Sequence, residues 1–345
     1  MATRRAVFLS GAIAAAVVIT GGCARSGGQT GPPAHGQTQA RTDKAEGYRA
    51  FLALANAGEV VRIDVADGDG GRPGVRVTPA GADNAGEGVA VAPAAGKLYV
   101  AETGQYDVLA VDTVTGKRTR IEVGPFPQDV AVAPSGRTAY ATVSGSDVVA
   151  VIDTESGTVR ADITAGPAPR QVVFGPDGTR AYVSTERGID VIDVATSSVI
   201  RVIPDPLGPQ GLAVSADGRT LYVTNPGSGT LWKLDPATGA LLASTITGSE
   251  PYAVTVAGSS VYTADMDADA VSVVSPVSGR VTGTIGVGRL PMSIAATPDG
   301  AQIWVGNGLS GTVSVISAAS RQVIATIRAA AGNTNPLGIA FAAPG

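Results

Sequence analysis

The chain has 345 residues, of which 46 are Gly and 22 are Pro, while charged residues make up 16% and apolar residues 44%. Frequent Gly and Pro between short runs of Val, Ile and Ala favour strands and turns over long helices, so we expect an all-β fold. The apolar fraction excludes a disordered chain, and Gly without a three-residue period excludes collagen.

The residue counts also exclude many catalytic and metal-binding chemistries. The chain has one Cys and one His, so it lacks the residues for a disulfide framework or a Cys/His zinc site. A His-ligated haem or a Ser/His/Asp triad would need His35 as its ligand or base. His35 lies in a Gly-, Pro- and Gln-rich stretch that is typical of a solvated linker. The chain has 25 Lys and Arg residues and 29 Asp and Glu residues, and its basic residues form no continuous run. We therefore expect no nucleic-acid partner, and we expect no cofactor or metal.

Residues 1–22 have the pattern of an export signal. Arg4 and Arg5 precede an apolar run at residues 6–19, which as a helix would span roughly 21 Å and not the roughly 30 Å core of a bilayer. Small residues then lead to Cys23, and the segment resembles a bacterial lipoprotein signal, although Thr20 stands where Leu is usual. The resemblance implies lipidation of Cys23 and anchoring on the extracytoplasmic face of the cell membrane. The alternative is an ordinary secretory signal with Cys23 as an incidental thiol.

The rest of the chain divides into a tether and a repeat domain. Residues 23–47 are polar and rich in Gly, Gln and Pro, which predicts a flexible tether. Residues 48–345 form repeats, in which a first, degenerate unit has its aromatic anchor near Phe51 or Ala53 and carries an insertion with Asp67 and Asp69. The later anchors are 41, 42, 40, 40 and 42 residues apart, at Tyr99, Tyr140, Tyr182, Tyr222, Tyr262 and Trp304.

Each unit shows four strand signals separated by turn residues. In one unit these signals lie at residues 129–133, 138–142, 148–152 and 158–163. Asp-Gly or Ser-Gly pairs follow the first signal and Thr-Gly or Ser-Gly pairs the third, and Gly there admits the positive φ of a tight hairpin. Four antiparallel strands repeated around an axis predict a β-propeller.

The motif Tyr222-Val223-Thr224-Asn225 makes the sequence resemble a known family. It spells the motif for which the YVTN family of β-propeller repeats is named, and the neighbouring Pro-x-x-Val-Ala-Val and Val-Ile-Asp patterns also resemble that family. The resemblance covers nearly all of residues 48–345 and implies WD40-like, four-stranded blades. The departures are Trp304 in place of Tyr, a shortened loop at residues 185–189, and the degenerate first unit.

The two ends of the repeat region predict how the ring closes. The first unit begins at its second strand, whereas residues 336–342 match the first strand of a unit and have no strands after them. Read in place, they are the inner strand that the first unit lacks, so we expect a seven-bladed propeller whose C-terminal strand joins the N-terminal blade. Burial of Ile339 and Phe341 would contribute roughly 1.5 to 3 kcal/mol each.

The mouth of the central channel is the expected site, because one loop from every blade meets there. Pro127, Pro169, Pro209, Pro251, Pro291 and Pro336 precede inner strands, with Gly86 in the seventh place. The next residues make half of the rim polar and half apolar. We expect a small molecule, a peptide or an envelope protein to bind there, whereas the alternative is that these positions vary because nothing packs on them. The expected ligand-binding residues are Glu87, Gln128, Asp129, Arg170, Gln171, Gln210, Tyr252 and Met292, with Ser293 and Leu337 beside them.

The loops between second and third strands should share this face. One of them carries Asp265, Asp267 and Asp269 in the alternation of a calcium loop, but it lacks the Gly and Glu of an EF-hand. We predict a solvated acidic hairpin there, and the same for Asp67 and Asp69.

Three functions remain open at this point, and we favour a binding or scaffolding module on the outer side of a bacterial envelope. The fold resembles the seven-bladed lactonases and the streptogramin lyases, whose catalysis depends on His. Because residues 48–345 contain no His, a lactonase-like hydrolase would rest on Glu87 or Asp129 as base with Arg170 stabilising an oxyanion. The third possibility is a structural surface-layer or assembly component. Propellers that carry haem d1 or pyrroloquinoline quinone are disfavoured by the missing His and the scarce Trp.

Overall fold

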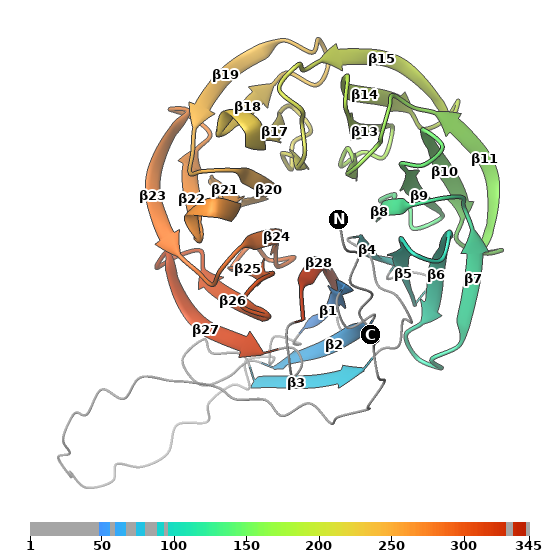
Figure 1. Cartoon of the computed structure of the whole chain (residues 1–345), viewed down its shortest axis with the longest axis horizontal. Helices are drawn as coiled ribbons and strands as arrows, with labels where there is room; N and C mark the ends of the chain where they lie inside the picture. The colour runs from blue at the N-terminus through green and yellow to red at the C-terminus, as the bar shows by residue number, and fades with distance from the viewer. Residues whose placement is uncertain are drawn as a thin grey trace, which may run out of the picture.

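The strands surround a central axis as seven four-stranded antiparallel blades (Figure 1). The computed structural model describes residues 48–55, 59–66, 74–79, 88–92, 96–328 and 334–342, and these statements concern those residues. The predicted seven-bladed propeller is confirmed. Some predictions fall on residues outside the described part of the chain, namely those for 1–22 and 23–47 with Cys23 and His35, and those for Asp67, Asp69, Gly86 and Glu87.

Each blade runs from an inner strand beside the axis to an outer strand on the circumference. The inner strands are β4 (Val89–Ala92), β8 (Pro127–Val132), β12 (Val172–Phe174), β16 (Leu212–Val214), β20 (Pro251–Ala257), β24 (Pro291–Ala296) and β28 (Pro336–Ala342). The second strands are β1 (Tyr48–Leu54), β5 (Lys97–Glu102), β9 (Thr138–Val143), β13 (Arg180–Thr185), β17 (Leu221–Asn225), β21 (Ser260–Asp265) and β25 (Gln302–Asn307).

The third and outer strands complete the blades. The third strands are β2 (Glu59–Ala66), β6 (Asp107–Asp112), β10 (Val148–Asp153), β14 (Gly188–Asp193), β18 (Thr230–Leu234), β22 (Ala270–Ser275) and β26 (Thr312–Ser317). The outer strands are β3 (Gly74–Pro79), β7 (Arg118–Glu122), β11 (Thr158–Thr164), β15 (Ser198–Pro204), β19 (Leu241–Ile246), β23 (Arg280–Gly286) and β27 (Gln322–Arg328). Short 3₁₀ turns, η3 (Pro226–Ser228) and η4 (Met266–Ala268), follow β17 and β21. Within the described ranges, no helix has the length and apolarity that crossing a membrane requires.

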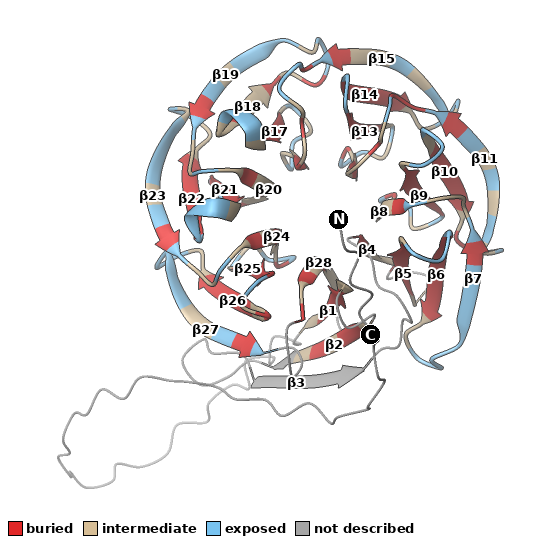
Figure 2. Cartoon of the chain, viewed as in Figure 1, coloured by how far each residue is buried: buried red, intermediate tan, exposed pale blue. Residues whose placement is uncertain are grey.

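The core lies between the blades, so the second and third strands are buried on both faces (Figure 2). The predicted aromatic anchors are all buried, and they pack across the blade boundaries. The Tyr140 ring, for example, lies 4.8 Å from the Phe174 ring of the next blade. Tyr99 donates a hydrogen bond of 3.2 Å to the carbonyl oxygen of Thr154, and burial, with a smaller contribution from the charge of Asp153, raises the pKa of Tyr99 to about 12.

Strand register identifies the anchor of the first blade. Phe51 pairs with Ala340 on the inner side and with Arg62 on the outer side. Tyr140 occupies the equivalent place in its blade, because it pairs with Ala131 and Val151. Phe51, and not Ala53, is therefore the anchor of this unit.

The ring closes as predicted, because β28 pairs with β1 and completes the sheet β28-β1-β2-β3. The Phe341 ring lies 5.4 Å from the Tyr48 ring and 5.5 Å from the Trp304 ring of the preceding blade. Both Tyr48 Oη and Trp304 Nε1 donate to Gln302 Oε1, at 2.6 and 3.1 Å. Ile339 and Phe341 are both half-buried, and Ile339 lines the central cavity, so each contributes less than a fully buried side chain would.

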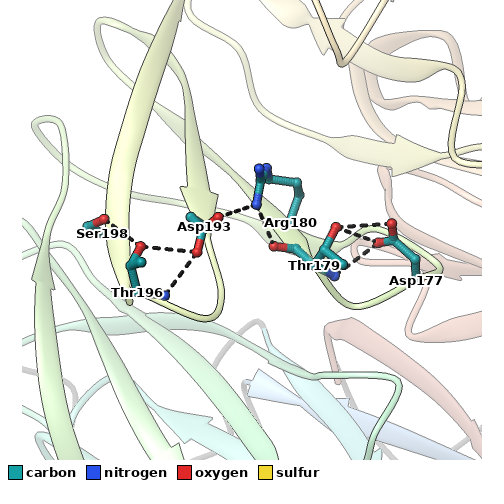
Figure 3. A network of polar contacts seen from close by, with 6 residues as sticks. All are labelled: Asp177, Thr179, Arg180, Asp193, Thr196 and Ser198. Atoms are coloured by element: carbon teal, nitrogen blue, oxygen red, sulfur yellow. Dashed lines mark hydrogen bonds and ion pairs between the residues drawn. The ribbon is translucent and has the colours of Figure 1, made fainter.

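Turns between the first and second strands and between the third and fourth lie at the end of each blade opposite the proposed rim. Figure 3 shows one such region, where Asp193 accepts hydrogen bonds from the backbone nitrogen of Thr196 at 2.9 Å and from its hydroxyl at 3.0 Å. The backbone bond is the main cause that holds the pKa of Asp193 below its ordinary value. Arg180 pairs with the same carboxylate. The predicted turn glycines have positive φ, at Gly116, Gly136, Gly157, Gly178, Gly218, Gly239, Gly279 and Gly300.

Removal of β28 tests the closure. A chain that ends at Gly332 leaves β1 without its inner neighbour, so we expect insoluble protein or loss of the cooperative thermal transition. A chain that ends at Ala342 is the matched control and should melt as the full chain does. In the full chain, Phe341→Ala should lower the free energy of unfolding by about 2 to 3 kcal/mol. A soluble Gly332 truncation with an unchanged melting temperature in circular dichroism would contradict this closure.

Candidate functional site

A cavity of about 350 Å³ lies on the axis and is lined by residues of six inner strands and by Gln210 and Gly211, which directly precede the seventh, β16. The residues predicted for the channel mouth line it together, apart from Glu87, which falls outside the described residues. The rim prolines that precede them are buried. The lining residues that the sequence singled out are Gln128, Asp129, Arg170, Gln171, Gln210, Tyr252, Met292, Ser293 and Leu337.

A tight backbone turn delivers each rim residue to the cavity. The residue before the buried proline has positive φ in five blades, at Phe126, Ala168, Gly208, Glu250 and Leu290. This conformation suits Gly and is strained for the other four residue types. In two blades the loop between the second and third strands holds it in place: Asp147 Oδ1 accepts from the nitrogen of Ala168, and Asp269 Oδ1 accepts from that of Leu290, both at 2.8 Å.

The polar half of the rim contains two side chains linked to each other. Arg170 Nη1 donates to Gln210 Oε1 at 3.2 Å and to the carbonyl oxygen of Pro209 at 3.4 Å. Gln128 Nε2 donates to Ser144 Oγ at 3.2 Å. All three rim side chains are half-buried, so they combine contact with solvent and a fixed hydrogen-bonding direction.

Asp129 and Gln171 link neighbouring inner strands. Asp129 Oδ2 accepts from the backbone nitrogen of Val172 at 3.0 Å, and Gln171 Oε1 accepts from that of Leu212 at 2.5 Å. Each bond crosses from one blade to the next, so these two side chains hold the rim together. The groups better placed to meet a ligand are therefore Gln128, Arg170 and Gln210.

Three hydroxyl groups reinforce the same blade boundaries. Thr142, Ser184 and Thr224 occupy equivalent positions on the second strands. Each hydroxyl accepts from the inner strand of its own blade and donates to a carbonyl oxygen of the next inner strand. The accepted bonds come from the nitrogens of Asp129, Gln171 and Gly211 at 3.0, 3.1 and 2.8 Å. The donated bonds go to the oxygens of Arg170, Gln210 and Tyr252 at 2.6, 2.8 and 2.9 Å.

The apolar half of the rim is joined differently. Ala264 and Gly306 stand at the equivalent second-strand positions and carry no hydroxyl. Ser293 Oγ instead donates to the carbonyl oxygen of Pro336 at 2.9 Å. A Cβ at Gly306 would lie 2.2 Å from both of these oxygens, so only Gly permits this close approach. The described rim residues follow one another around the cavity, with Gln128, Arg170 and Gln210 before Tyr252, Met292 and Leu337.

The loops between second and third strands share the rim face, but the acidic hairpin differs from its prediction. Asp265 is fully buried, so the solvated hairpin is wrong at this residue. Its carboxylate accepts from Ser272 Oγ at 2.5 Å and from Thr263 Oγ1 at 2.7 Å, while burial raises its pKa. Asp267 and Asp269 are exposed. Among the residues with described positions, no group of three or more His, Cys, Asp or Glu is arranged to hold a metal ion.

Several lining residues were missed by the sequence argument. The inner strands carry the cavity inward with apolar side chains such as Val130, Val172 and Val254. Their two-residue alternation could have indicated this wall. The hydroxyls of Thr142 and Ser184 at the blade boundaries had a weaker sequence signal. A Thr or Ser two residues after the anchor tyrosine is also common in a strand where it makes no contact with the next blade.

Comparison with known proteins finds one propeller family model and two curated relatives that match part of the chain. The family model described as YNCE-like beta-propeller matches residues 232–343. The chain is also similar to proteins named "Uncharacterized protein YncE" from Salmonella typhi and Salmonella typhimurium, each 29% identical over 193 residues. That match covers 54% of this chain and 54% of each relative. The chain thus spans about half the length of the curated relatives it matches.

Solved structures extend the similarity over most of the chain. A chain of Kuenenia stuttgartiensis hydrazine synthase is 20% identical with a TM-score of 0.66, covering 83% of this chain and 99% of that one. A Lactobacillus plantarum protein is 16% identical with a TM-score of 0.71, covering 86% and 99%. At such identities the likeness supports the propeller fold alone.

Removal of one hydroxyl at a blade boundary tests how much these hydrogen bonds stabilise the fold. Thr224→Val removes one hydroxyl with little change of shape and leaves the nitrogen of Gly211 unpaired, so unfolding should become easier by about 1 to 3 kcal/mol. Thr255→Val, on the adjacent inner strand, is the control, because no hydrogen bond to its hydroxyl occurs within the described part of the chain. Chemical denaturation measures both variants. Equal stability of the two would show that the Thr224 bridge contributes nothing.

Proposed function

We propose that the chain is a binding module whose channel mouth takes a small amphipathic molecule. The observation that supports this is the axial cavity, polar on one side and apolar on the other, to which all seven blades contribute lining residues. Ligand sites are commonly concave, largely apolar, and equipped with a few directed polar groups. The cavity volume of about 350 Å³ lies at the small end of such sites.

The chemistry of the rim favours a ligand with an acidic or carbonyl group at one end. Arg170 is the only cationic side chain among the described lining residues. Its fixed fork of donors suits an oxygen acceptor, and the amide of Gln128 adds another donor on the same side. Tyr252 and Met292 offer apolar surface on the opposite side, where Met adapts to ligands of different shape.

The proposal does not extend to catalysis. The titratable side chains among the described lining residues are Asp129, Arg170 and Tyr252. Asp129, one of the candidate bases, already accepts a hydrogen bond from the nitrogen of Val172. Binding requires no general base, so it explains the arrangement with fewer assumptions than hydrolysis.

Fluorescence titration with 8-anilinonaphthalene-1-sulfonate, an amphipathic sulfonate, tests the channel site. We expect saturable binding by residues 45–345, weakened about tenfold in Arg170→Gln through loss of a charge-assisted contact and similarly in Met292→Asn through loss of apolar contact. Arg219→Gln is the control, because Arg219 is exposed in the turn between β16 and β17, away from the rim. Equal affinity in all variants, or absence of saturable binding, would refute the proposed site.

We infer further that the protein is exported and anchored through a lipid on Cys23. The support is the resemblance of the first 23 residues to a lipoprotein signal. Expressed in a bacterial host with lipoprotein processing, the chain should partition with membranes, and mass spectrometry should find a lipidated N-terminal Cys23 peptide. Cys23→Ser should lose both the lipid and the membrane association. Recovery of an unmodified Cys23 thiol in an exported, soluble wild-type chain would refute the anchor.

A further inference from the structure

A second hollow, of about 560 Å³, lies on the rim face but outside the channel. It is formed by the loop from β23 to β24, the loop from β25 to β26, and the strands β26 and β27. We call it the blade-seven groove. Its polar lining residues are Arg289, Ser310, Thr312, Ser314, Thr326 and Arg328.

The blade-seven groove is cationic. Two arginines line it, Arg289 and Arg328, and no carboxylate is among the lining residues. Within the described part of the chain, neither arginine lies within ion-pairing distance of an acidic side chain. Both are exposed. Among the described residues, no acidic side chain thus balances their charges.

In two other blades, an arginine at the corresponding place is paired with a carboxylate of its own blade. In the β4–β7 blade, Arg120 Nη1 lies 3.0 Å from Glu102 Oε2 and 2.9 Å from Asp107 Oδ2. In the β12–β15 blade, Arg187 Nη2 lies 3.0 Å from Asp190 Oδ1. Glu102, Asp107 and Asp190 are all buried. In these two blades the arginine is thus neutralised by an acid of the same blade.

In the last blade, neutral groups replace these acids. Strand register places Asn307 where Glu102 and Asp265 stand, since Asn307 pairs with Thr312 as Glu102 pairs with Asp107. Asn307 is fully buried. Its Nδ2 donates to Thr312 Oγ1 at 3.1 Å and to Ser314 Oγ at 2.9 Å.

The amide of Asn307 leaves two hydroxyl protons for a ligand. Because Thr312 and Ser314 each accept from Nδ2, their own O–H groups are directed away from that nitrogen. In the described residues neither hydroxyl donates to a protein acceptor. The preceding blade shows the contrast, since there Ser272 donates its proton to the carboxylate of Asp265 at 2.5 Å.

We propose that the blade-seven groove binds the acidic group, phosphate or carboxylate, of a small organic molecule. The anion supplies the negative charge that Glu102, Asp107 and Asp190 supply in their blades. Arg289 and Arg328 offer charge-assisted donors, and the half-buried hydroxyl of Thr312 offers a neutral one, while Ser314 is buried beneath it. Leu309, 45% exposed, and Val323, 38% exposed, provide apolar surface for the rest of the molecule.

Isothermal titration with phenyl phosphate tests the proposal, and benzoate separates phosphate from carboxylate recognition. Wild-type protein should bind at least one probe saturably, and the double variant Arg289→Gln/Arg328→Gln should bind it at least tenfold more weakly. Asn307→Asp changes one amide to a carboxylate of the same shape. It should also abolish binding, because the new carboxylate accepts from Thr312 and Ser314 and attracts both arginines, as an internal substitute for the ligand.

Two controls keep the result specific to the blade-seven groove. Arg321→Gln removes an exposed arginine of the same blade that does not line the groove and should leave affinity unchanged. Arg170→Gln weakens any binding of the same probes in the axial cavity, and it should leave the binding component that depends on Arg289 and Arg328 unchanged, because Arg170 does not line the groove. Thermal melts check folding, and if Asn307→Asp fails to fold, the double arginine variant decides. No saturable binding of either probe, unchanged affinity in the double variant, or loss only in Arg170→Gln would overturn the proposal.

Discussion

The pairing of β28 with β1 is the interaction on which the rest of the molecule depends. It joins residues almost 300 positions apart, so closing the chain costs roughly 5 kcal/mol of loop entropy. Partial burial of Phe341 and its ring contacts with Tyr48 and Trp304 return about 2 to 6 kcal/mol. The backbone pairing from Arg49 to Leu54 adds to this. Only with this strand in place do the inner strands surround one cavity.

The blade boundaries around that cavity are not equivalent, although the units repeat. Hydroxyl bridges from Thr142, Ser184 and Thr224 join the inner strands of the polar half, and Asp129 and Gln171 add a second set of bonds there. These side chains stabilise the contacts between blades. The neighbouring rim residues Gln128, Arg170 and Gln210 therefore remain available to contact a ligand. A rigid polar side opposite an adaptable apolar side suits ligands that share a head group and differ elsewhere.

Periodicity predicted the architecture because it depends on features that every unit shares. Buried tyrosines, rim prolines and turn glycines recur at similar spacing. The unmatched strand at residues 336–342 indicated how the ring of blades closes. Contacts made by single residues that the repeat does not share left no such signal. Asp265 resembled a loop residue because acids follow it, yet it ends β21 inside the blade and is bonded to Ser272 of β22. Choosing between Phe51 and Ala53 likewise required the register with β28.

Charge balance distinguishes the axial cavity from the blade-seven groove. Arg289 and Arg328 are exposed, so water stabilises them without a partner and the fold does not require a bound anion. An anion that binds there gains mainly from attraction to exposed charge, which salt screens over about 8 Å at physiological ionic strength. At the channel mouth, contact with Tyr252 and Met292 contributes a hydrophobic part that added salt does not weaken. Added salt therefore weakens anion binding in the groove more than ligand binding in the channel. The two sites lie on one face of the ring but differ in the interaction that dominates binding.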